Sequence, residues 1–361
     1  MSALKIRSKA MLGTTHSWAI TIRALLSQFE LMGHDLYLNS INGYDLFPKD
    51  WKGYKRNAKN IDIDLTYTLP RNFDQRFNND SKLKLAIYNY ESSILPKVWA
   101  DKINYIDYAL PSSTFSKEVF VNSGWPEEKC IVVPHGINQK DFEDKSTVKN
   151  LKTRKKFKFL NVSIPHYRKN IDILVDAYYG AFNHDDEVCL LIKTKLNKPK
   201  YKFECDIVKQ ILKAQKKHSG KKLPQVEVVQ TKYDSMVPLY NTCDCLVSAS
   251  SAEGFGLPLL EALAAGMIVI APRYSGQLDF LNDDNSILVD VKHIKAGDKY
   301  QYWRATPGAM TSVPEVEALS ASMRRSYENY IDLQKLFKHG IESTIQKFTW
   351  ENAAKQILEI L

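Results

Sequence analysis

Short apolar runs with the length of β-strands alternate with helical segments along almost the whole chain of 361 residues. The first run, residues 8–12, leads through Gly13 into an amphipathic segment that Gly33 closes as a C-terminal helix cap. The apolar positions of this segment are Ile20, Leu25, Leu26 and Phe29. Alternating strands and helices are typical of parallel sheets with helical crossovers, so the pattern predicts doubly wound α/β sheets.

The alternation falls into two series, separated by a charged stretch. Residues 139–158 hold few apolar side chains before Phe157, which is typical of a linker. Before the linker, further strands are expected at 35–40, 61–65, 83–88, 108–111 and 130–133. After it, strands are expected at 157–162, 188–192, 226–229, 245–248, 268–271 and, at a sheet edge, 287–289. Helices are expected at 170–182, 205–218, 235–241 and 258–265 and in the tail from Glu315. We therefore predict two Rossmann-like domains, residues 1–150 and 151–345, and a terminal helix within 346–361 that returns to the first domain.

The composition is that of a globular protein, with 44% hydrophobic and 25% charged residues. No run approaches the roughly 18 apolar residues of a membrane-spanning helix, and the first residues lack the apolar core of a signal peptide. The five cysteines, at positions 130, 189, 205, 243 and 245, do not form the ligand set of a zinc site. We expect reduced thiols and a cytoplasmic location.

The net charge is +9, and eleven lysines lie between Lys193 and Lys222. The simplest interpretation of this run is a solvated helix face. It is also suited to peripheral contact with an anionic membrane, which would be the inner face of the cell membrane. No recognition helix, zinc knuckle or aromatic–basic platform accompanies it, so nucleic acid is not an expected partner.

One glycine-punctuated loop carries most of the functional signal. A strand ends near Ser248, glycines in the stretch 250–266 allow a ligand to approach the backbone, and Pro258 falls in the first turn of a helix. The free amides and the dipole at such a helix start suit an anion such as a nucleotide diphosphate. Glu261 lies within reach of ribose hydroxyls, and Glu253 precedes it on the loop. The structural alternative is an acidic helix start with glycines that serve only the turn.

This stretch resembles the signature of glycosyltransferase family 4, in which two glutamates, here Glu253 and Glu261, are separated by seven residues. Residues 133–137, 239–244, 275–281 and 348–351 resemble other family motifs in the same order. The resemblance implies a GT-B fold, in which two Rossmann-like domains face each other across a cleft. It also implies metal-independent, retaining transfer of a hexose from a nucleotide-diphosphate sugar to a saccharide or lipid-linked acceptor, as in polysaccharide biosynthesis. No cofactor is implied beyond the donor itself. Retention would follow from same-face attack by the acceptor, with the leaving phosphate as base.

The resemblance implies donor roles residue by residue. Glu261 would hold the ribose and Glu253 the donor sugar, while Gly254, Phe255, Gly256 and Leu257 would offer backbone amides. Lys169 and Arg168 would neutralise the diphosphate. The family's glycine–arginine pair is replaced here by Ser163 and Ile164, so either Arg168 supplies the charge from a different place or the phosphate clamp is weaker.

The remaining candidates lie on other loops. The resemblance implies that Gly13 and Thr14 face the diphosphate and the acceptor, and that Glu91 contacts the acceptor. His16 is a further candidate for the acceptor site, and Thr231, with Lys232 and Tyr233, would adjoin the base. For each, an ordinary turn or exposed loop is the structural alternative. His135 is expected to satisfy local backbone groups, and His166 is a further cleft candidate.

Two other functions stay open. Asp62 and Asp64 have the spacing of the carboxylate pair of a metal-dependent GT-A transferase, but the alternation of Ile61, Ile63 and Leu65 predicts a strand with both acids on its exposed face. A nucleotide-sugar-binding protein that has lost transfer is kept open by Ile164. A serine hydrolase is not predicted, since no Gly-x-Ser-x-Gly motif occurs.

Overall fold

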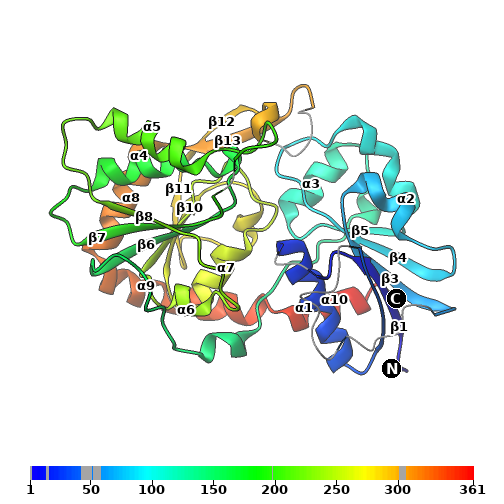
Figure 1. Ribbon diagram of the computed structural model, residues 1–361. Helices are drawn as coiled ribbons and strands as arrows, with labels where there is room; N and C mark the ends of the chain where they lie inside the picture. Colours follow the sequence, from blue (N-terminus) through cyan, green and yellow to red (C-terminus); the bar gives the residue numbers. More distant parts are fainter. Residues whose placement is uncertain (1, 14–15, 42–50, 52–57, 197, 301–305) are drawn as a thin grey trace. The chain divides into compact units, whose positions relative to one another are not determined.

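The computed structural model describes residues 2–13, 16–41, 51, 58–196, 198–300 and 306–361 (Figure 1). The chain divides into two compact units. The first unit comprises Met1–Tyr90, Ile94–Gly136 and Phe348–Leu361, and the second comprises Glu91–Ser93 and Ile137–Lys347. Each contains a parallel sheet with helical connections, which confirms the predicted α/β class.

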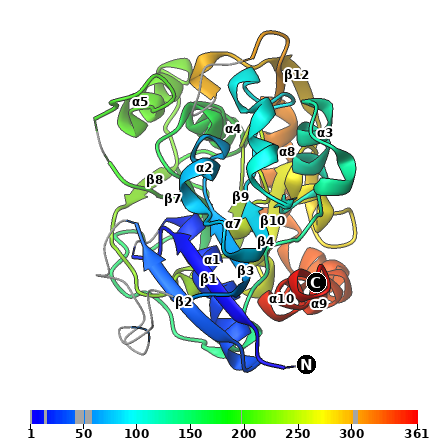
Figure 2. The same cartoon turned by 90° about the vertical axis from the view of Figure 1, so that its right-hand side faces the viewer.

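The sheet of the first unit has five parallel strands in the order β2-β1-β3-β4-β5. Their bounds are β1 (Lys5–Ala10), β2 (Asp35–Ser40), β3 (Ile61–Tyr67), β4 (Ser81–Ile87) and β5 (Tyr108–Leu110). β1 pairs with β2 on one side and with β3 on the other, and Figure 2 shows β1 and β2 side by side. The strand order reverses at this point, so the carboxyl end of β1 is the switch point where ligands bind in such sheets.

The helices of the first unit are α1 (Ser17–Leu31), α2 (Phe73–Arg76), α3 (Thr114–Asn122) and α10 (Trp350–Leu358). α1 buries Leu25, Leu26 and Phe29, and Gly33 has the positive φ of 85° expected at its C-terminal cap. Ile20 is 39% exposed, so its assignment to the apolar face was wrong. The buried residues Ala19 and Ile22 are three apart and share one face of the helix, whereas Ile20 directly follows Ala19 and lies off that face.

The strand expected at 130–133 does not form. Cys130 makes an isolated bridge to Ala109, and Val133 donates a backbone hydrogen bond to Pro111. The bounding Pro111 and Pro134 have no N–H group to donate to a neighbouring strand, which prevents a continuous ladder.

Two segments that are far apart in the sequence meet in the first unit. The rings of His135 and Trp350 lie 5.7 Å apart, and α10 packs against α1. A Cβ atom at Gly136 would lie 2.1 Å from the carbonyl carbon of Thr349. Only glycine fits this close approach of two backbones.

The sheet of the second unit has six parallel strands in the order β11-β10-β9-β6-β7-β8. Their bounds are β6 (Phe157–Val162), β7 (Val188–Lys193), β8 (Gln225–Val229), β9 (Cys245–Val247), β10 (Ile268–Pro272) and β11 (Ile287–Val289). Nearly all side chains of β7 and β10 are buried, as expected for parallel strands covered on both faces. All six strands were predicted, and β11 is the expected edge strand.

Helices cover both faces of this sheet. α4 (Ile171–Ala181) packs against α5 (Ile207–Lys217) and α8 (Val316–Glu328), whereas α7 (Leu257–Ala264) packs against α6 (Val237–Tyr240) and α9 (Tyr330–Lys347), as Figure 1 shows. An antiparallel hairpin of β12 (Val291–Lys295) and β13 (Met310–Pro314) was not predicted. Within the described part of the chain, no helix is both long and apolar enough to cross a membrane. All five cysteines are buried and free.

Candidate functional site

Loops from three neighbouring strands of the second sheet form the candidate site. β6, β9 and β10 lie side by side, and their carboxyl ends lead into residues 163–170, 248–256 and 273–276. Because all strands are parallel, these loops meet at one edge of the sheet, where doubly wound folds bind ligands. Arg168, Lys169 and Glu253 are brought together there.

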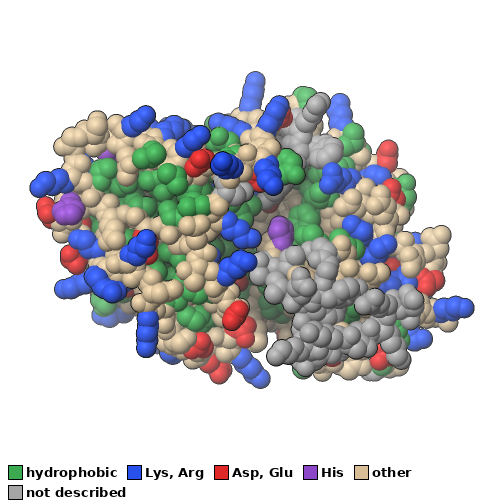
Figure 3. All heavy atoms as spheres, in the orientation of Figure 1, with side chains coloured by type: hydrophobic (Ala, Val, Ile, Leu, Met, Phe, Trp, Pro, Cys, Tyr) green, Lys and Arg blue, Asp and Glu red, His purple; other side chains and the backbone are tan. Residues whose placement is uncertain are grey.

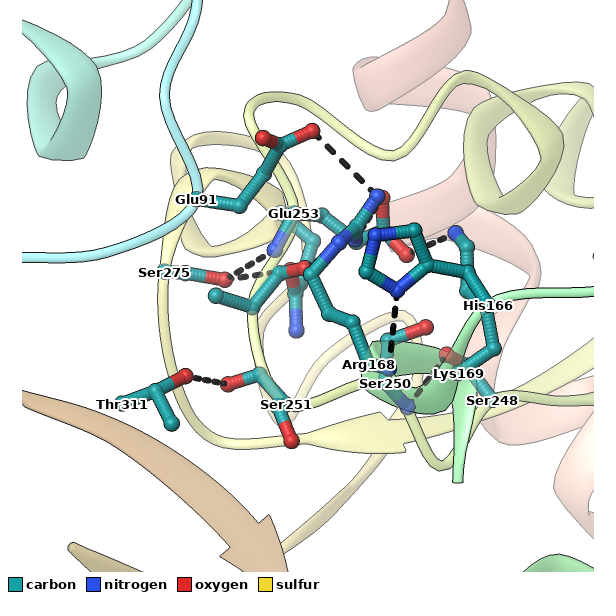
Figure 4. Close-up of polar contacts among 12 residues, drawn as sticks. Glu91, His166, Arg168, Lys169, Ser248, Ser250, Ser251, Glu253, Ser275 and Thr311 are labelled. Carbon is teal, nitrogen blue, oxygen red and sulfur yellow. Dashed lines mark hydrogen bonds and ion pairs between the residues drawn. The ribbon is translucent and has the colours of Figure 1, made fainter. Parts of the chain in front are cut away.

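Four charged side chains, Glu91, Arg168, Lys169 and Glu253, form what we call the charged cluster (Figure 4). Lys169 Nζ donates to Glu253 Oε1. The Arg168 guanidinium lies 3.2 Å from Glu253 Oε2 through one terminal nitrogen and 3.3 Å from Glu91 Oε1 through the other. The side chains are 4% exposed for Arg168, 13% for Lys169, 12% for Glu253 and 21% for Glu91. The cluster is therefore largely shielded from bulk water, which strengthens its electrostatic interactions.

Burial and neighbouring charges shift the pKa values of the cluster in different directions. Burial on its own would raise the pKa of Glu253, but the Lys169 and Arg168 cations outweigh it and lower this pKa to about 2. Burial lowers the pKa of Lys169 despite its contact with Glu253. Burial raises the pKa of Glu91 against the attraction of Arg168, and Glu253 adds to the rise. Glu253 is thus ionised at neutral pH, and Glu91 is the carboxylate of the cluster that gains a proton first.

Backbone and side-chain hydrogen bonds fix the two loops that carry the cluster. Asn170, in the left-handed conformation with φ 47°, donates from its side chain to Ala249 O at 2.8 Å and Ser251 Oγ at 2.9 Å. The Ser251 N–H donates to Arg168 O at 2.8 Å. His166 Nδ1 accepts from the Arg168 N–H at 3.0 Å, so His166 orients the loop that carries the two cations.

The loop that carries Glu253 is fixed from β10 as well. The Glu253 N–H donates to Ser275 Oγ at 2.8 Å, and the Gly276 N–H donates to Glu253 O at 3.0 Å. Ser275 has a positive φ of 74°, a conformation that a serine rarely adopts. Residues 275–281 resemble a family motif, but neither Ser275 nor Asn170 was predicted to support the site.

α7 begins as the sequence predicted. Gly256 is its N-terminal cap, with φ 94°, and Pro258 follows within the first turn. Phe255 is buried against Phe280 with ring centres 4.9 Å apart, and Leu257 is buried too. Gly254 is likewise buried. The side chains of Phe255 and Leu257 thus serve the core, and what this loop offers a ligand is backbone.

Glu261 lies on α7 and accepts a hydrogen bond of 2.6 Å from the Tyr240 hydroxyl of α6. Burial raises the pKa of Glu261 to about 7, and the hydrogen bond from Tyr240 offsets part of the effect. Tyr240 is fully buried. The partnership of Tyr240 with Glu261 was not predicted, because the two residues lie on different helices and their separation in the sequence does not indicate a contact.

The other candidates make none of the described contacts of the charged cluster. Thr231 is exposed after β8, where Lys193 Nζ lies 5.8 Å from the ring of the neighbouring Tyr233. Gly13 is buried after β1, and His16 caps α1 by accepting from the Trp18 N–H at 3.3 Å; both belong to the first unit. Thr14 lies outside the described residues. Ile164 is 44% exposed, whereas the Arg168 guanidinium is in the cluster.

The predicted exposure of both acids on β3 was wrong. Asp64 is fully buried and pairs with Arg7 at 2.6 Å. Asp62 accepts from Lys82 Nζ at 2.7 Å and from the Lys5 N–H at 2.9 Å. Both carboxylates therefore have internal partners.

His135 is buried, which lowers its pKa to about 3 and keeps its ring neutral.

Residues 142–300 match the family described as glycosyl transferases group 1. A probable sucrose-phosphate synthase from Thermosipho melanesiensis is 23% identical over 303 residues, which are 80% of this chain and 62% of that protein. A D-inositol 3-phosphate glycosyltransferase from Corynebacterium urealyticum is 27% identical over 128 residues, 35% of this chain and 25% of that protein. The chain thus spans less than two thirds of the length of these relatives.

Solved structures resemble this chain over almost its whole length. A glycosyltransferase from Rickettsia africae has a TM-score of 0.72 at 17% identity, covering 100% of this chain and 98% of that one. The Anabaena protein Alr3699/HepE, in complex with UDP and glucose, has a TM-score of 0.72 at 13% identity, covering 99% of each. At these identities the likeness shows a shared fold.

Proposed function

Residues 142–300 belong to the glycosyl transferases group 1, the fold is GT-B, and from this premise we propose that the protein transfers a hexose from a nucleotide-diphosphate sugar to a saccharide or lipid-linked acceptor. The observation that carries the proposal is the charged cluster, which lies on the loops beside the start of α7. Two cations and a row of helix-start amides at one sheet edge suit a diphosphate.

The donor would bind by exchanging partners in the charged cluster. Lys169 and Arg168 now contact Glu253, and a diphosphate would replace that carboxylate on one or both cations. Glu253 would then accept hydrogen bonds from hydroxyls of the donor sugar. Glu261, held by Tyr240, would accept from the ribose. Thr231 would lie beside the base.

The chemistry would break the bond between the anomeric carbon and the β-phosphate oxygen. Negative charge grows on the departing diphosphate, where Lys169, Arg168 and the amides at Gly254–Leu257 would stabilise it. The acceptor hydroxyl would attack from the same face, form the new bond to the anomeric carbon, and pass its proton to a phosphate oxygen. Configuration would be retained, with no metal or further cofactor, so we expect activity to survive a chelator.

A nucleotide-sugar-binding protein without transfer is the second candidate. The observation that favours it is the pairing of Arg168 with both Glu91 and Glu253, which lowers the positive charge that a diphosphate meets. Turnover separates the two candidates, since the binding protein would take up nucleotide and release no product.

The test is release of nucleoside diphosphate from a panel of nucleotide sugars in the presence of saccharide acceptors. Lys169→Gln is expected to lower turnover by about 100-fold or more, as for loss of one charged donor to a leaving group, equivalent to about 3 kcal/mol. Lys156→Gln, which removes an exposed lysine of the same unit, is the matched control. Equal rates in both variants would refute the diphosphate role of Lys169.

We further propose that α5 contacts an anionic membrane from the cytoplasmic side. Val208 and Leu212 are 45% and 49% exposed, and Lys209, Lys213 and Lys216 line a shallow hollow with Leu212. Figure 3 shows Lys and Arg side chains interspersed with hydrophobic ones over the face drawn. An apolar stripe beside lysines is typical of interfacial helices. Lys209→Glu with Lys216→Glu should abolish sedimentation with phosphatidylglycerol vesicles, and unchanged sedimentation would leave α5 as ordinary surface.

A further inference from the structure

A small pocket of about 120 Å³ lies beside β1 in the first unit. Arg7 and Lys9 are two residues apart on β1, so they share one face of the strand. Asn39 on β2 is the sheet partner of Lys9. The other polar residues of the wall are Arg76, Asn78 and Asp80. Three cations and two side-chain amides thus line one pocket.

The carboxylates in this region are committed to Arg7. Its guanidinium donates to Asp64 at 2.6 Å and to Asp80 at 2.9 Å. Lys9 Nζ donates to the carbonyl of Gln75 at 2.8 Å, a neutral acceptor. Among the described residues, the two acids bonded to Arg7 and the three bases of the wall leave an excess of one positive charge.

Arg76 is the residue that this balance leaves unneutralised. Among the described residues, no carboxylate lies within ion-pair distance of Arg76, and its Nε atom is buried with no hydrogen-bond partner. Burial lowers the pKa of Arg76, and no carboxylate of the described residues counters the effect. A cation withdrawn from water without an anion is unfavourable, so buried charges are normally paired.

We propose that an oxyanion of the phosphate class completes this pocket, with Arg76 and Lys9 as its charged ligands and the amides of Asn39 and Asn78 as further donors. Guanidinium, ammonium and amide groups are the donors that bind phosphate oxygens. Asp80 does not oppose the anion strongly, because Arg7 already neutralises it. These residues all belong to the first unit, whereas the charged cluster belongs to the second. The pocket therefore shares no residue with the charged cluster.

The test is calorimetric titration of the full chain with inorganic phosphate at constant ionic strength. Lys169→Gln weakens the diphosphate site proposed for the charged cluster and should still bind phosphate through this pocket, because Lys169 is not among the pocket's residues. Arg76→Gln and Lys9→Gln should each weaken binding at least tenfold while leaving nucleoside diphosphate affinity unchanged. Arg71→Gln, at an exposed arginine of the same segment, is the control. Wild-type phosphate binding by Arg76→Gln, or none by wild type, would overturn the proposal.

Stability gives a second, independent result. In chloride buffer, Arg76→Gln should melt at the same temperature as wild type or higher, because it removes a partly buried charge that has no carboxylate partner among the described residues. Saturating phosphate should raise the melting temperature of wild type by roughly 3 °C or more and leave the variant unchanged. A marked loss of stability in chloride would show that Arg76 has an internal anion and would refute the site.

The source of the phosphate group is resolved by comparing glucose 6-phosphate with inorganic phosphate, and with glucose as the uncharged reference. Tighter binding of the monoester would assign the pocket to a phosphorylated ligand, and equal binding would assign it to free phosphate. Both results support the oxyanion site. Equal binding of glucose and glucose 6-phosphate would contradict it.

Discussion

The partly buried carboxyl of Glu261 should make the stability of the second unit depend on pH. Burial raises its pKa from 4.5 to about 7. Between these values the folded protein holds a proton that the unfolded chain has released. The folded state then binds more protons, so the free energy of unfolding falls as the pH rises from about 4.5 to 7. Glu261→Gln removes this ionisation and should remove the dependence with it.

The magnitude follows from the gap between the two pKa values. A difference of about 2.5 units corresponds to roughly 3 kcal/mol, at 1.36 kcal/mol per unit. The glutamine carbonyl can still accept the hydrogen bond from Tyr240, so the packing of the two helices is kept. We therefore expect wild type and Glu261→Gln to be about equally stable at pH 4.5. At pH 8 the variant should be more stable by up to ~3 kcal/mol.

The assay is urea denaturation of both proteins at pH 4.5, 6, 7 and 8. Only the difference between them is interpreted, because groups with the opposite sign, such as Glu253 with its lowered pKa, are common to both. Glu317→Gln, at an exposed position of the same unit, should show no pH-dependent difference. A constant difference between wild type and Glu261→Gln from pH 4.5 to 8 would refute the reasoning.

Three further changes test the site and the first unit. Glu261→Gln should also weaken nucleoside diphosphate binding, measured by calorimetry at pH 8, because a neutral amide is a poorer acceptor for ribose hydroxyls than a carboxylate; unchanged affinity would reject the ribose role. Glu91→Gln should strengthen nucleoside diphosphate binding by about fivefold, or ~1 kcal/mol, because it removes a carboxylate that competes for Arg168. The gain in affinity should vanish at low pH, where Glu91 of the wild type is protonated. Weaker binding by the variant would mean that Glu91 holds Arg168 in place. Gly136→Ala should lower the free energy of unfolding by at least ~2 kcal/mol, since its Cβ would overlap the Thr349 backbone, whereas Gly297→Ala has open space and should be neutral.

The second sheet could be predicted closely because most of its strands are buried on both faces. Such strands are continuous apolar runs, and a run such as residues 157–162 is visible without knowledge of any partner. The hairpin of β12 and β13 is different. β12 is mostly exposed and alternates weakly, and its pairing depends on a second strand across a long connection. No local feature of the sequence therefore indicates the pairing of β12 with β13.

The burial of charged side chains was the feature that the sequence predicted least well. The alternation around Asp64 predicted an exposed carboxylate, yet Asp64 is buried because Arg7 lies beside it on the neighbouring strand. The same difficulty hides the pairing of Glu91 with Arg168. Opposite charges that neutralise each other across strands or loops leave no periodic signal, since each residue alone has the pattern of a solvated position.

The charged cluster also shows why Arg168 can lie in the site although Ile164 occupies the position where the family resemblance implies arginine. In an extended chain, side chains of consecutive residues point to opposite sides. Here Tyr167–Lys169 form a short 3₁₀ turn, and Asn170 follows in the left-handed conformation with its side chain bonded to Ala249 and Ser251. This turn directs Arg168 and Lys169 to the same carboxylate, as Figure 4 shows. A diphosphate that binds at this edge must then compete with Glu253 for both cations. Donor binding and the release of Glu253 toward the sugar would therefore be a single event, set by the loop conformation rather than by the spacing of the basic residues.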